Sequence, residues 1–265
     1  MTRPSQPWAI ASGRNAPLDM AIDANDVYWT ENNTGGVYQV GKSGGSVVTI
    51  KAADNVVNSS WAVATDSTGG GTLVFWADRA HGRVGAAPVG GGATPWYFDS
   101  PNGSGAGTYG IAQDYDKTVD RVFASDFSTG GVWTFGANHS GGTGLVDYSA
   151  TGPTGLFALG GNNVLVTLYA SGSVQNDATM IATGKNDDAR YVTSDGTTAF
   201  WTASDGNQVW AAPINGNGTT PVLVSGSESQ PWGIATDGTS SIYWVNKTSG
   251  TVVHGSLSAT AGRRR

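Results

Sequence analysis

Cysteine is absent from this chain of 265 residues, which excludes disulfide bonds, thiolate nucleophiles and cysteine-ligated metals together. Charge is also scarce, because Asp, Glu, Lys and Arg make up only 13% of the sequence, about half of the usual share. No segment reaches the roughly 18 consecutive apolar residues of a membrane-spanning helix, and none keeps the 3.6-residue apolar period of an amphipathic helix. The sequence therefore predicts neither a disulfide scaffold nor a helical or membrane-spanning protein.

Acidic residues outnumber basic ones, with 20 Asp and Glu against 14 Lys and Arg and a net charge of −6. Three of the basic residues form the run Arg263–Arg265, within a segment, 258–265, that we expect to be a flexible tail. An acidic surface repels phosphate, so we expect no nucleic-acid partner, and we expect a monomer. The first residues, Met1–Pro4, contain no apolar stretch typical of an export signal, which leaves the compartment open.

What the sequence does have is an internal repeat. One unit is clearest near the C-terminus, where the block Pro231–Asp237 (PWGIATD) is followed by Ile242–Asn246 (IYWVN). Related pairs of blocks occur upstream, and the first blocks start at residues 17, 60, 108, 153, 189 and 231. This spacing of 36 to 48 residues is typical of one supersecondary unit, and the units account for nearly the whole chain.

Each unit reads as four short strands. A glycine and an alternating run such as Gly131–Phe135 follow most pairs of blocks, and an apolar run such as Pro221–Val224 closes most units. The runs are rich in Val, Ile, Tyr, Phe and Trp and are bounded by Gly, Asn, Asp and Ser, which is the pattern of antiparallel hairpins. Six such units predict an all-β, six-bladed β-propeller, and an open β-solenoid is the alternative. The expected blades are residues 17–50, 60–98, 108–146, 153–181, 189–224 and 231–257.

The sixth unit lacks its fourth strand, and the N-terminus supplies a candidate for it. Trp8–Gly13 precedes the first unit as Pro221–Gly226 precedes the sixth. We therefore expect residues 7–12 to pair as the outer strand of the last blade. Such pairing joins the first and last blades and leaves the ring without an open side.

The second blocks IYWVN, VYWTE (27–31) and VFWAD (74–78) resemble the YWTD repeat of six-bladed propellers. The first blocks, such as Gly233–Asp237, resemble those of the NHL and gluconolactonase-type relatives. The resemblance covers residues 7–257, and the fourth unit departs from it most, with Leu159 in place of the Asp. It implies the propeller fold and an extracellular or periplasmic setting. It does not decide the function, since these families include enzymes, receptors and scaffolds.

Two repeated features have structural interpretations. The Asp that ends the first block in five units can accept backbone N–H bonds and fix the turn that follows. The adjacent aromatic pairs of the second blocks point to opposite faces of a strand, so they are expected to pack against both neighbouring blades. The aspartates are Asp23, Asp66, Asp114, Asp195 and Asp237. The pairs are Tyr28–Trp29, Phe75–Trp76, Phe200–Trp201 and Tyr243–Trp244.

The candidate binding residues lie where the first strands begin, because these strands line the central channel of a propeller. The loops between second and third strands are expected at the same face. Aromatic stacking and polar hydrogen bonds there suit a small polar ligand, such as a sugar, or a peptide side chain; the alternative is that Trp61 and Trp232 only plug the channel mouth. The candidates are Trp61, Tyr109, Arg190 and Trp232 on the first strands, with Asn32, Asp78, Asp126 and Asn246 from the loops.

Catalytic signals are weak. The three His have no zinc-ligand spacing, and no GxSxG motif is present. The gluconolactonase-type resemblance implies a divalent ion held by a Glu at the start of a first strand, but here the only two Glu are Glu31 and Glu228. We predict no cofactor; a Ca²⁺ or Mg²⁺ ion in the channel on Glu31, Asp78, Asp126 and Asn246 is the alternative.

The leading interpretation is a non-catalytic binding or scaffold propeller that recognises a small polar, sugar-like ligand or a protein or peptide on the channel face. The first alternative is a divalent-metal-dependent enzyme of the lactonase or lyase type with its site at the channel. The second is an orphan or engineered propeller without a selected ligand, which would fit the low charge and the absence of Cys.

Overall fold

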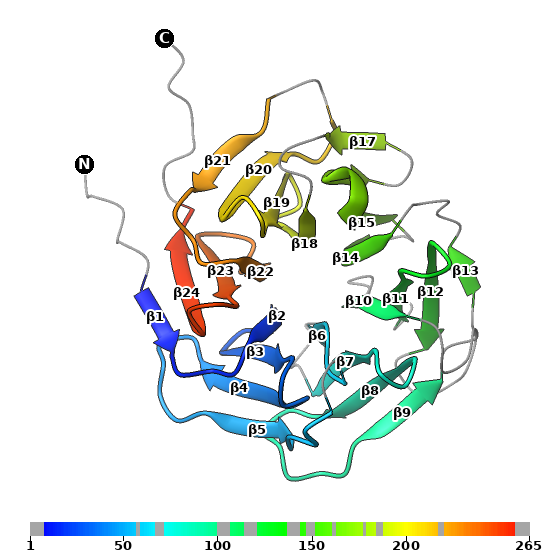
Figure 1. The fold of residues 1–265 in the computed structure, drawn as a ribbon, viewed down its shortest axis with the longest axis vertical. Helices are drawn as coiled ribbons and strands as arrows, with labels where there is room; N and C mark the ends of the chain where they lie inside the picture. The colour runs from blue at the N-terminus through cyan, green and yellow to red at the C-terminus, as the bar shows by residue number, and fades with distance from the viewer. Residues whose placement is uncertain are drawn as a thin grey trace.

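The computed structural model describes residues 8–56, 59–66, 72–99, 107–113, 121–136, 144–146, 152–160, 163–176, 179–183, 188–216 and 220–257. These residues form strands β1 to β24 and a single turn of 3-10 helix at Tyr169–Ser171. The strands make six four-stranded antiparallel sheets that surround a central axis (Figure 1). The predicted six-bladed β-propeller is confirmed. Within the described ranges, no helix has the length and apolar character needed to cross a membrane.

The strands of each blade are given below in order from the innermost to the outermost. The first blade contains β2 (Pro17–Ile22), β3 (Asp26–Glu31), β4 (Val37–Gly41) and β5 (Val48–Lys51), and the second contains β6 (Val63–Thr65), β7 (Leu73–Asp78), β8 (Arg83–Pro88) and β9 (Trp96–Asp99). The third contains β10 (Thr108–Gln113), β11 (Arg121–Asp126), β12 (Gly131–Gly136) and β13 (Gly144–Val146), and the fourth contains β14 (Pro153–Gly160), β15 (Asn163–Leu168), β16 (Ser173–Asn176) and β17 (Thr179–Ala182). The fifth contains β18 (Ala189–Ser194), β19 (Thr198–Ala203), β20 (Gln208–Pro213) and β21 (Val222–Ser225), and the sixth contains β22 (Pro231–Thr236), β23 (Ser241–Asn246), β24 (Thr251–Ser256) and β1 (Trp8–Ala11).

The N-terminal strand closes the ring as predicted. The sixth sheet has the order β1-β24-β23-β22, with Trp8 opposite His254 and Ala9 opposite Val253 in an antiparallel pair. The last blade thus joins the two ends of the chain. The tail expected at 258–265 lies outside the described residues.

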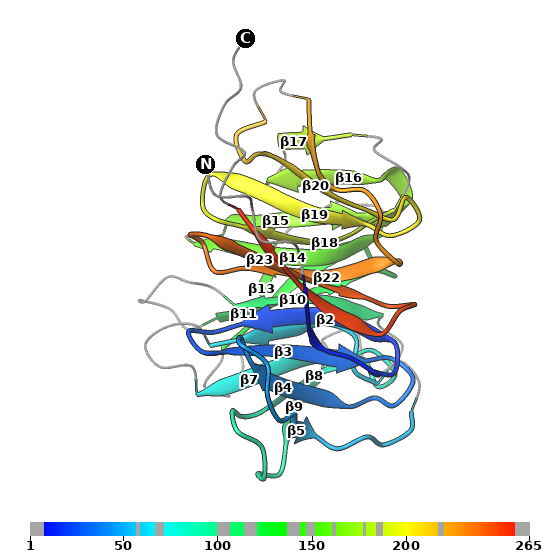
Figure 2. The ribbon, with the colours of Figure 1, turned by 90° about the vertical axis from the view of Figure 1, so that its left-hand side faces the viewer.

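The inner strands run roughly along the ring axis, so each begins at one face of the disc and ends at the other (Figure 2). Pro17 at the start of β2 pairs with Glu31 at the end of β3, and Pro231 pairs with Asn246 in the same way. The loops after the second strands therefore lie at the face where the inner strands begin, as predicted. We call this the start face, and the opposite face, where the turns after the inner strands lie, the end face.

The aromatic pairs of the second strands form the core between blades. Tyr28 and Trp29 are fully buried and belong to different core clusters, and the same holds for Phe75 and Trp76. The pairs at 200–201 and 243–244 are buried as well. Adjacent side chains therefore face opposite neighbours, and the structural interpretation of these pairs is confirmed.

A bulge at the start of the inner strand is repeated in five blades, where the pairing register shifts between the first and fourth residues of the strand. In four blades the hydroxyl of a Ser or Thr near the end of the second strand accepts a backbone N–H of the bulged segment. The Thr167 hydroxyl accepts the N–H of Gly155 at 2.7 Å and donates to the carbonyl of Arg190 in the next blade at 2.7 Å. Thr30, Ser125 and Thr202 make equivalent contacts. One hydroxyl thus accepts a backbone N–H of the bulged strand and also forms a hydrogen bond to the next blade.

The turn aspartates hold the first hairpin of their blades. Asp23 accepts the N–H groups of Asn25 and Asp26, each at 2.8 Å. Asp195 and Asp237 accept equivalent amides from the residues that follow them. Their structural role is confirmed in these three blades, while Asp114 lies outside the described residues.

Candidate functional site

The start face of the channel is closed by three aromatic rings. The Trp61 ring contacts Tyr109 and Trp232 edge-on, with centroid separations of 4.9 and 5.6 Å. Only 8% of Trp61 and 6% of Trp232 are exposed. The two tryptophans therefore fill the mouth of the channel, as one of the two interpretations of these residues expects.

Three cationic side chains lie over this aromatic cluster. The Arg79 guanidinium is 4.6 Å from the Trp61 ring and 4.5 Å from the Tyr109 ring. Arg190 and Lys247 lie 4.5 and 4.2 Å from the Trp232 ring. These are cation–π distances. Because the tryptophans are buried beneath them, a ligand at this face meets guanidinium and ammonium groups before any aromatic surface.

Acidic groups balance this positive charge only in part. Arg190 forms an ion pair of 2.5 Å with Asp188, which is fully buried. Burial raises the pKa of Asp188 to about 6, although Arg190 acts to lower it. Burial and the neighbouring Arg190 lower the pKa of Lys247. Within the part of the chain that the structure describes, neither Arg79 nor Lys247 has an ion-pair partner, so this face keeps uncompensated positive charge.

The acidic residues expected to hold a metal are separated and occupied. Glu31 pairs with Arg14 at 2.6 Å, and Asp126 accepts the N–H of Ser128 at 2.9 Å. The described residues contain no group of three or more His, Asp or Glu that could hold an ion. The structure thus places Glu31, Asp78 and Asp126 one to a blade and does not bring them together.

Asp78 shows why these residues do not converge. Its carboxylate lies 2.8 Å from His81 Nδ1 and 2.8 Å from Arg83 Nε. All three residues belong to one blade. Asp78 therefore stabilises its own loop, which leaves little of its carboxylate for an ion in the channel.

The other two polar candidates are also held locally. Asn246 donates to Glu228 at 2.8 Å, and the backbone N–H of Asn32 donates to the carbonyl of Ala16 at 3.0 Å. The side-chain oxygen of Asn32 is buried without a hydrogen-bond partner. Of the eight predicted ligand-binding residues, the structure brings together the four on or next to the inner strands, through the contacts Tyr109–Trp61–Trp232–Arg190.

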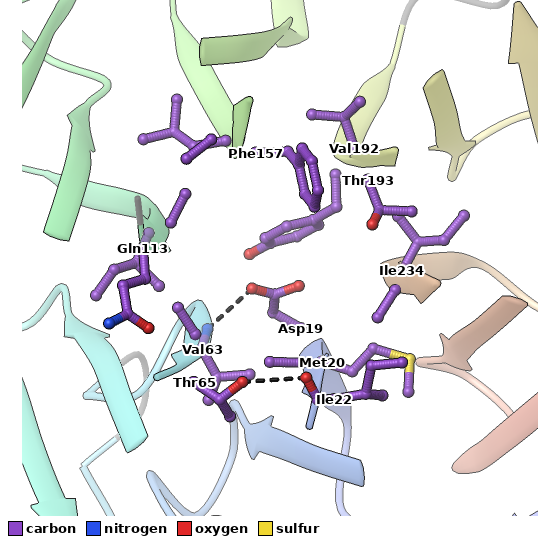
Figure 3. A pocket seen from close by; sticks show the side chains of 18 of the residues that line it. Asp19, Met20, Ile22, Val63, Thr65, Gln113, Phe157, Val192, Thr193 and Ile234 are labelled. Carbon is purple, nitrogen blue, oxygen red and sulfur yellow. Dashed lines mark hydrogen bonds between the residues drawn. The ribbon is translucent and has the colours of Figure 1, made fainter. Parts of the chain in front are cut away.

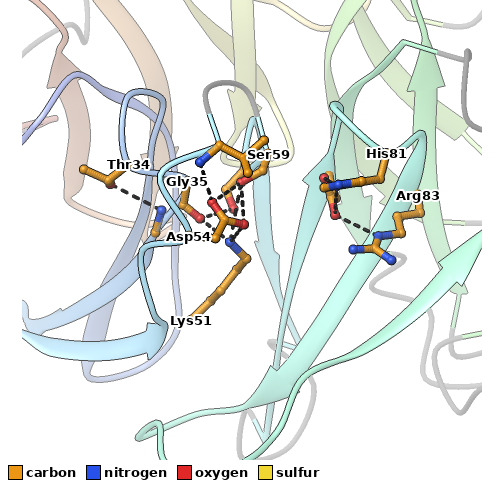
Figure 4. A network of polar contacts seen from close by, with 11 residues as sticks. Thr34, Gly35, Lys51, Asp54, Ser59, His81 and Arg83 are labelled. Atoms are coloured by element: carbon orange, nitrogen blue, oxygen red, sulfur yellow. Dashed lines mark hydrogen bonds and ion pairs between the residues drawn. The ribbon is translucent and has the colours of Figure 1, made fainter.

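A second polar cluster, visible in Figure 4, joins the first two blades. The buried Lys51 donates to the Gly35 carbonyl at 2.5 Å and to Asp54 at 2.8 Å, and Ser59 donates to Asp54 at 3.0 Å. Burial alone would raise the pKa of Asp54, but hydrogen bonds from Lys51, Val56 and Ser59 lower it. Every polar group has a partner, so the cluster is structural.

The channel interior holds two functional candidates that the sequence analysis missed. The third residue of the inner segment is Ala62, Gly110, Gly155 or Gly233 in four blades, and at Gly155 and Gly233 a Cβ would collide with backbone of the next blade. In the other two blades it is Asp19 and Tyr191, both buried. This break in the repeat was visible in the sequence and is the signal that could have identified them.

The Asp19 side chain lies inside the channel, where most of the surrounding residues are apolar. Only 4% of it is exposed, and its Oδ2 accepts the N–H of Val63 at 2.9 Å. Figure 3 shows its carboxylate at the centre of a cavity, whose volume is about 120 Å³. Burial raises the pKa of Asp19 well above its usual value, against the opposing effect of the amides of Val63 and Met20. Burial and the nearby Asp19 also raise the pKa of the Tyr191 hydroxyl.

The channel opens into a larger basin at the end face, with a volume of about 700 Å³. Inner cavity and basin share five lining residues, so they adjoin. Asp23, Asp195 and Asp237 line the basin, with Lys42 as its cation. Burial alone would raise the pKa of Asp237, but the amides that it accepts lower it below its usual range. The basin is therefore lined by three aspartates, whereas Arg79, Arg190 and Lys247 gather over the aromatic cluster of the start face.

Comparison with known proteins places the chain by its fold. No protein-family model and no curated protein matches the sequence. A catalytically inactive virginiamycin B lyase from Staphylococcus aureus, solved with quinupristin, matches with a TM-score of 0.67 and 14% identity over 95% of this chain and 98% of its own. A PQQ-bound aldose sugar dehydrogenase from Streptomyces coelicolor matches with a TM-score of 0.72 and 12% identity over 96% of this chain and 99% of its own. A chain of a nidogen/laminin complex matches with a TM-score of 0.62 and 19% identity over 76% of this chain and 77% of its own.

These similar structures include two enzymes and one member of a protein–protein complex. At such low sequence identity they share the six-bladed fold, and the fold hosts both catalysis and binding. The function of this chain has to be argued from its own residues.

Proposed function

We propose that this protein is a non-catalytic recognition module that binds a small acidic ligand, such as a sugar acid, at the start face. The single observation that carries the proposal is the convergence of Arg79, Arg190 and Lys247 over the Trp61–Trp232 cluster. The whole chain has only 14 Lys and Arg. A cationic patch in so acidic a protein fits a negatively charged ligand.

The aromatic rings beneath the cations give the site its rigidity. A guanidinium held against a ring has little freedom left to lose on binding, and it presents a planar pair of N–H donors to a carboxylate. Arg79 rests on two rings, and Arg190 rests on Tyr169 and Trp232. Preorganised donors of this kind favour a small ligand with one carboxylate.

The binding interpretation is supported over a metal-dependent lactonase or lyase reaction by the state of the acidic residues. Asp78 has its partner within its own blade, and Glu31 and Asn246 are held by Arg14 and Glu228 from the links between blades. A metal would have to displace these partners, and the ion pairs of two buried carboxylates would be lost. Arg79 and Lys247, which have no ion-pair partner among the described residues, need no such rearrangement to accept an anion.

Isothermal titration calorimetry with glucuronate tests the proposal, with glucose as the neutral control. We expect the wild-type protein to bind glucuronate and to bind glucose much more weakly. A double variant, Arg79→Gln with Arg190→Gln, should lose about tenfold or more in affinity for glucuronate, because a charge-assisted hydrogen bond contributes about 1.5–3 kcal/mol.

Lys42→Gln provides a matched control, because it removes one positive charge from the end face and leaves the start face intact. This variant should bind glucuronate as the wild type does. Equal affinity for glucose and glucuronate, or an unchanged affinity in the double variant, would contradict the proposed site.

A further inference from the structure

The third residue of the inner segment is Gly or Ala in four blades. In the other two blades, Asp19 and Tyr191 place a large polar side chain in the channel. Gly110, Gly155 and Gly233 allow neighbouring strands to approach closely, which is a structural reason for a missing side chain. No comparable packing reason explains a carboxylate at Asp19, because burying a carboxylate is costly unless it is paired.

The Asp19 carboxylate has acceptor capacity that the protein does not use fully. A carboxylate offers about four acceptor sites, and the amides of Val63 and Met20 occupy two of them. Tyr191, the other exception in the repeat, interacts with Asp19 electrostatically from the far side of the channel. Its hydroxyl donates to the Trp61 carbonyl at 3.4 Å, which is a long hydrogen bond. These two groups face a cavity whose other walls include Ile111, Leu156 and Ile234.

Access to Asp19 is from the end face. The tryptophan pair closes the other mouth, whereas the basin of about 700 Å³ adjoins the inner cavity. Three aspartates against one lysine at the basin favour the approach of a cation. The inner cavity of about 120 Å³ is smaller than the roughly 150 Å³ that accommodates benzene in an engineered protein, so it suits a narrow group.

From this arrangement we propose that the channel is a second ligand site, which takes a linear primary amine: the ammonium group binds Asp19, and the methylene chain lies along the apolar walls toward the basin. An ammonium group brings three donors, which match the carboxylate and the Tyr191 hydroxyl. A free alkyl diamine and the side chain of a peptide lysine present the same group. This site is distinct from the anion site proposed above, because the Trp61–Trp232 pair lies between the channel interior and the start-face cations.

Calorimetry with 1,5-diaminopentane tests this proposal, with 1,5-pentanediol as the uncharged control. The wild-type protein should bind the diamine and not the diol. Asp19→Asn keeps the shape and one acceptor for the Val63 amide but removes the charge, and it should weaken diamine binding at least tenfold. Nα-acetyl-lysine methylamide, as a second ligand, distinguishes the sources: binding of both amines indicates a peptide lysine, and binding of the diamine alone indicates a free amine.

Asp205→Asn is the matched control, because Asp205 is an exposed acid outside the channel lining; this variant should bind the diamine as the wild type does. Should Asp19→Asn fail to fold, Tyr191→Phe supplies a milder change, for which we expect a several-fold loss. Failure of the wild type to bind the diamine at millimolar concentration, or equal binding by a folded Asp19→Asn variant, would overturn the proposal.

Discussion

The two mouths of the channel differ although the same six blades build both. The start face is closed by Trp61 and Trp232 and carries cations, while the end face is open and carries aspartates. The aspartates recur at one position of the repeat and each fixes a turn, so the acidity of the end face follows from the way the hairpins are made. Arg79 and Lys247 each follow the second strand of a blade and Arg190 lies on an inner strand, but the equivalent positions of the other blades carry no Lys or Arg.

This contrast separates structure from function in a repeated fold. A residue type that recurs from blade to blade has a structural role that the blades share, such as fixing a turn, filling the core or forming a hydrogen bond between blades. A residue type that occurs at an equivalent position in one blade only, such as Asp19, has no structural role shared by the blades. Such a residue is a candidate for function. In this molecule such residues lie at the start-face cluster and, beneath it, in the channel at Asp19 and Tyr191.

The largest expected effect comes from removing the strand that holds both mouths in shape. Deleting residues 1–13 removes β1 and should lower the melting temperature strongly and abolish ligand binding at both faces, because β24 becomes an unpaired edge. Thermal denaturation followed by circular dichroism measures the effect. Truncation after Leu257 is the control and should leave the melting temperature nearly unchanged. An unchanged melting temperature in the deletion variant would refute the role of β1 in closure.

A smaller effect should distinguish the closed mouth from the open one. Trp61→Ala should cost about 3–5 kcal/mol of unfolding free energy, as expected for removal of a buried aromatic ring, and it removes one of the two rings beneath Arg79. Phe157→Ala, at a half-buried ring that lines the basin, should cost clearly less. Urea denaturation of both variants gives the comparison. Equal losses would mean that the start face is not more tightly packed than the end face.

The smallest expected effect is a pH dependence confined to the start face. The pKa of Asp188 is about 6, above its usual value, so the carboxyl group is neutral below this pH and no longer offsets the charge of Arg190. Glucuronate binding should therefore strengthen a few-fold between one pH unit above that value and one unit below it. For the same reason the contribution of Asp188 to stability is present at low pH and is lost as the pH rises through 6.

Two variants test whether the pH dependence of glucuronate binding comes from Asp188. Asp188→Asn should bind glucuronate with nearly the same affinity at both pH values. Asp205 also raises the pKa of Asp188, so Asp205→Asn should keep the dependence but move it to lower pH. A pH response that survives in Asp188→Asn would assign it to another group.

Much of the fold could be predicted because repetition multiplies weak local signals. A single block such as VFWAD is an ambiguous short strand, but related blocks at regular spacing leave few alternatives. The closing strand could be predicted for the same reason, since the sixth unit lacked a part that the N-terminus resembled. The aromatic pairs were interpreted correctly, because neighbouring residues of a strand must face opposite sides.

The candidate site could be predicted only in part. Its tryptophans were found because the start of an inner strand has a known place in the ring, but their burial beneath Arg79 and Lys247 depends on loop conformations that no repeat specifies. Asp19 was overlooked because it lies in a segment read as core strand. The alternative of a metal site required acidic residues that share a face to converge, but each is held by a nearer partner, as Asp78 is by Arg83.

The pairing of β1 with β24 also decides how this molecule can be attached to something else. β1 is the outer strand of its blade, at the rim of the disc and away from the axis on which both mouths lie (Figure 1). A partner fused ahead of Trp8 would hang from the circumference and leave both mouths accessible. Because the first and last strands are neighbours, the chain also lends itself to circular permutation, with new ends cut in a link between any two blades.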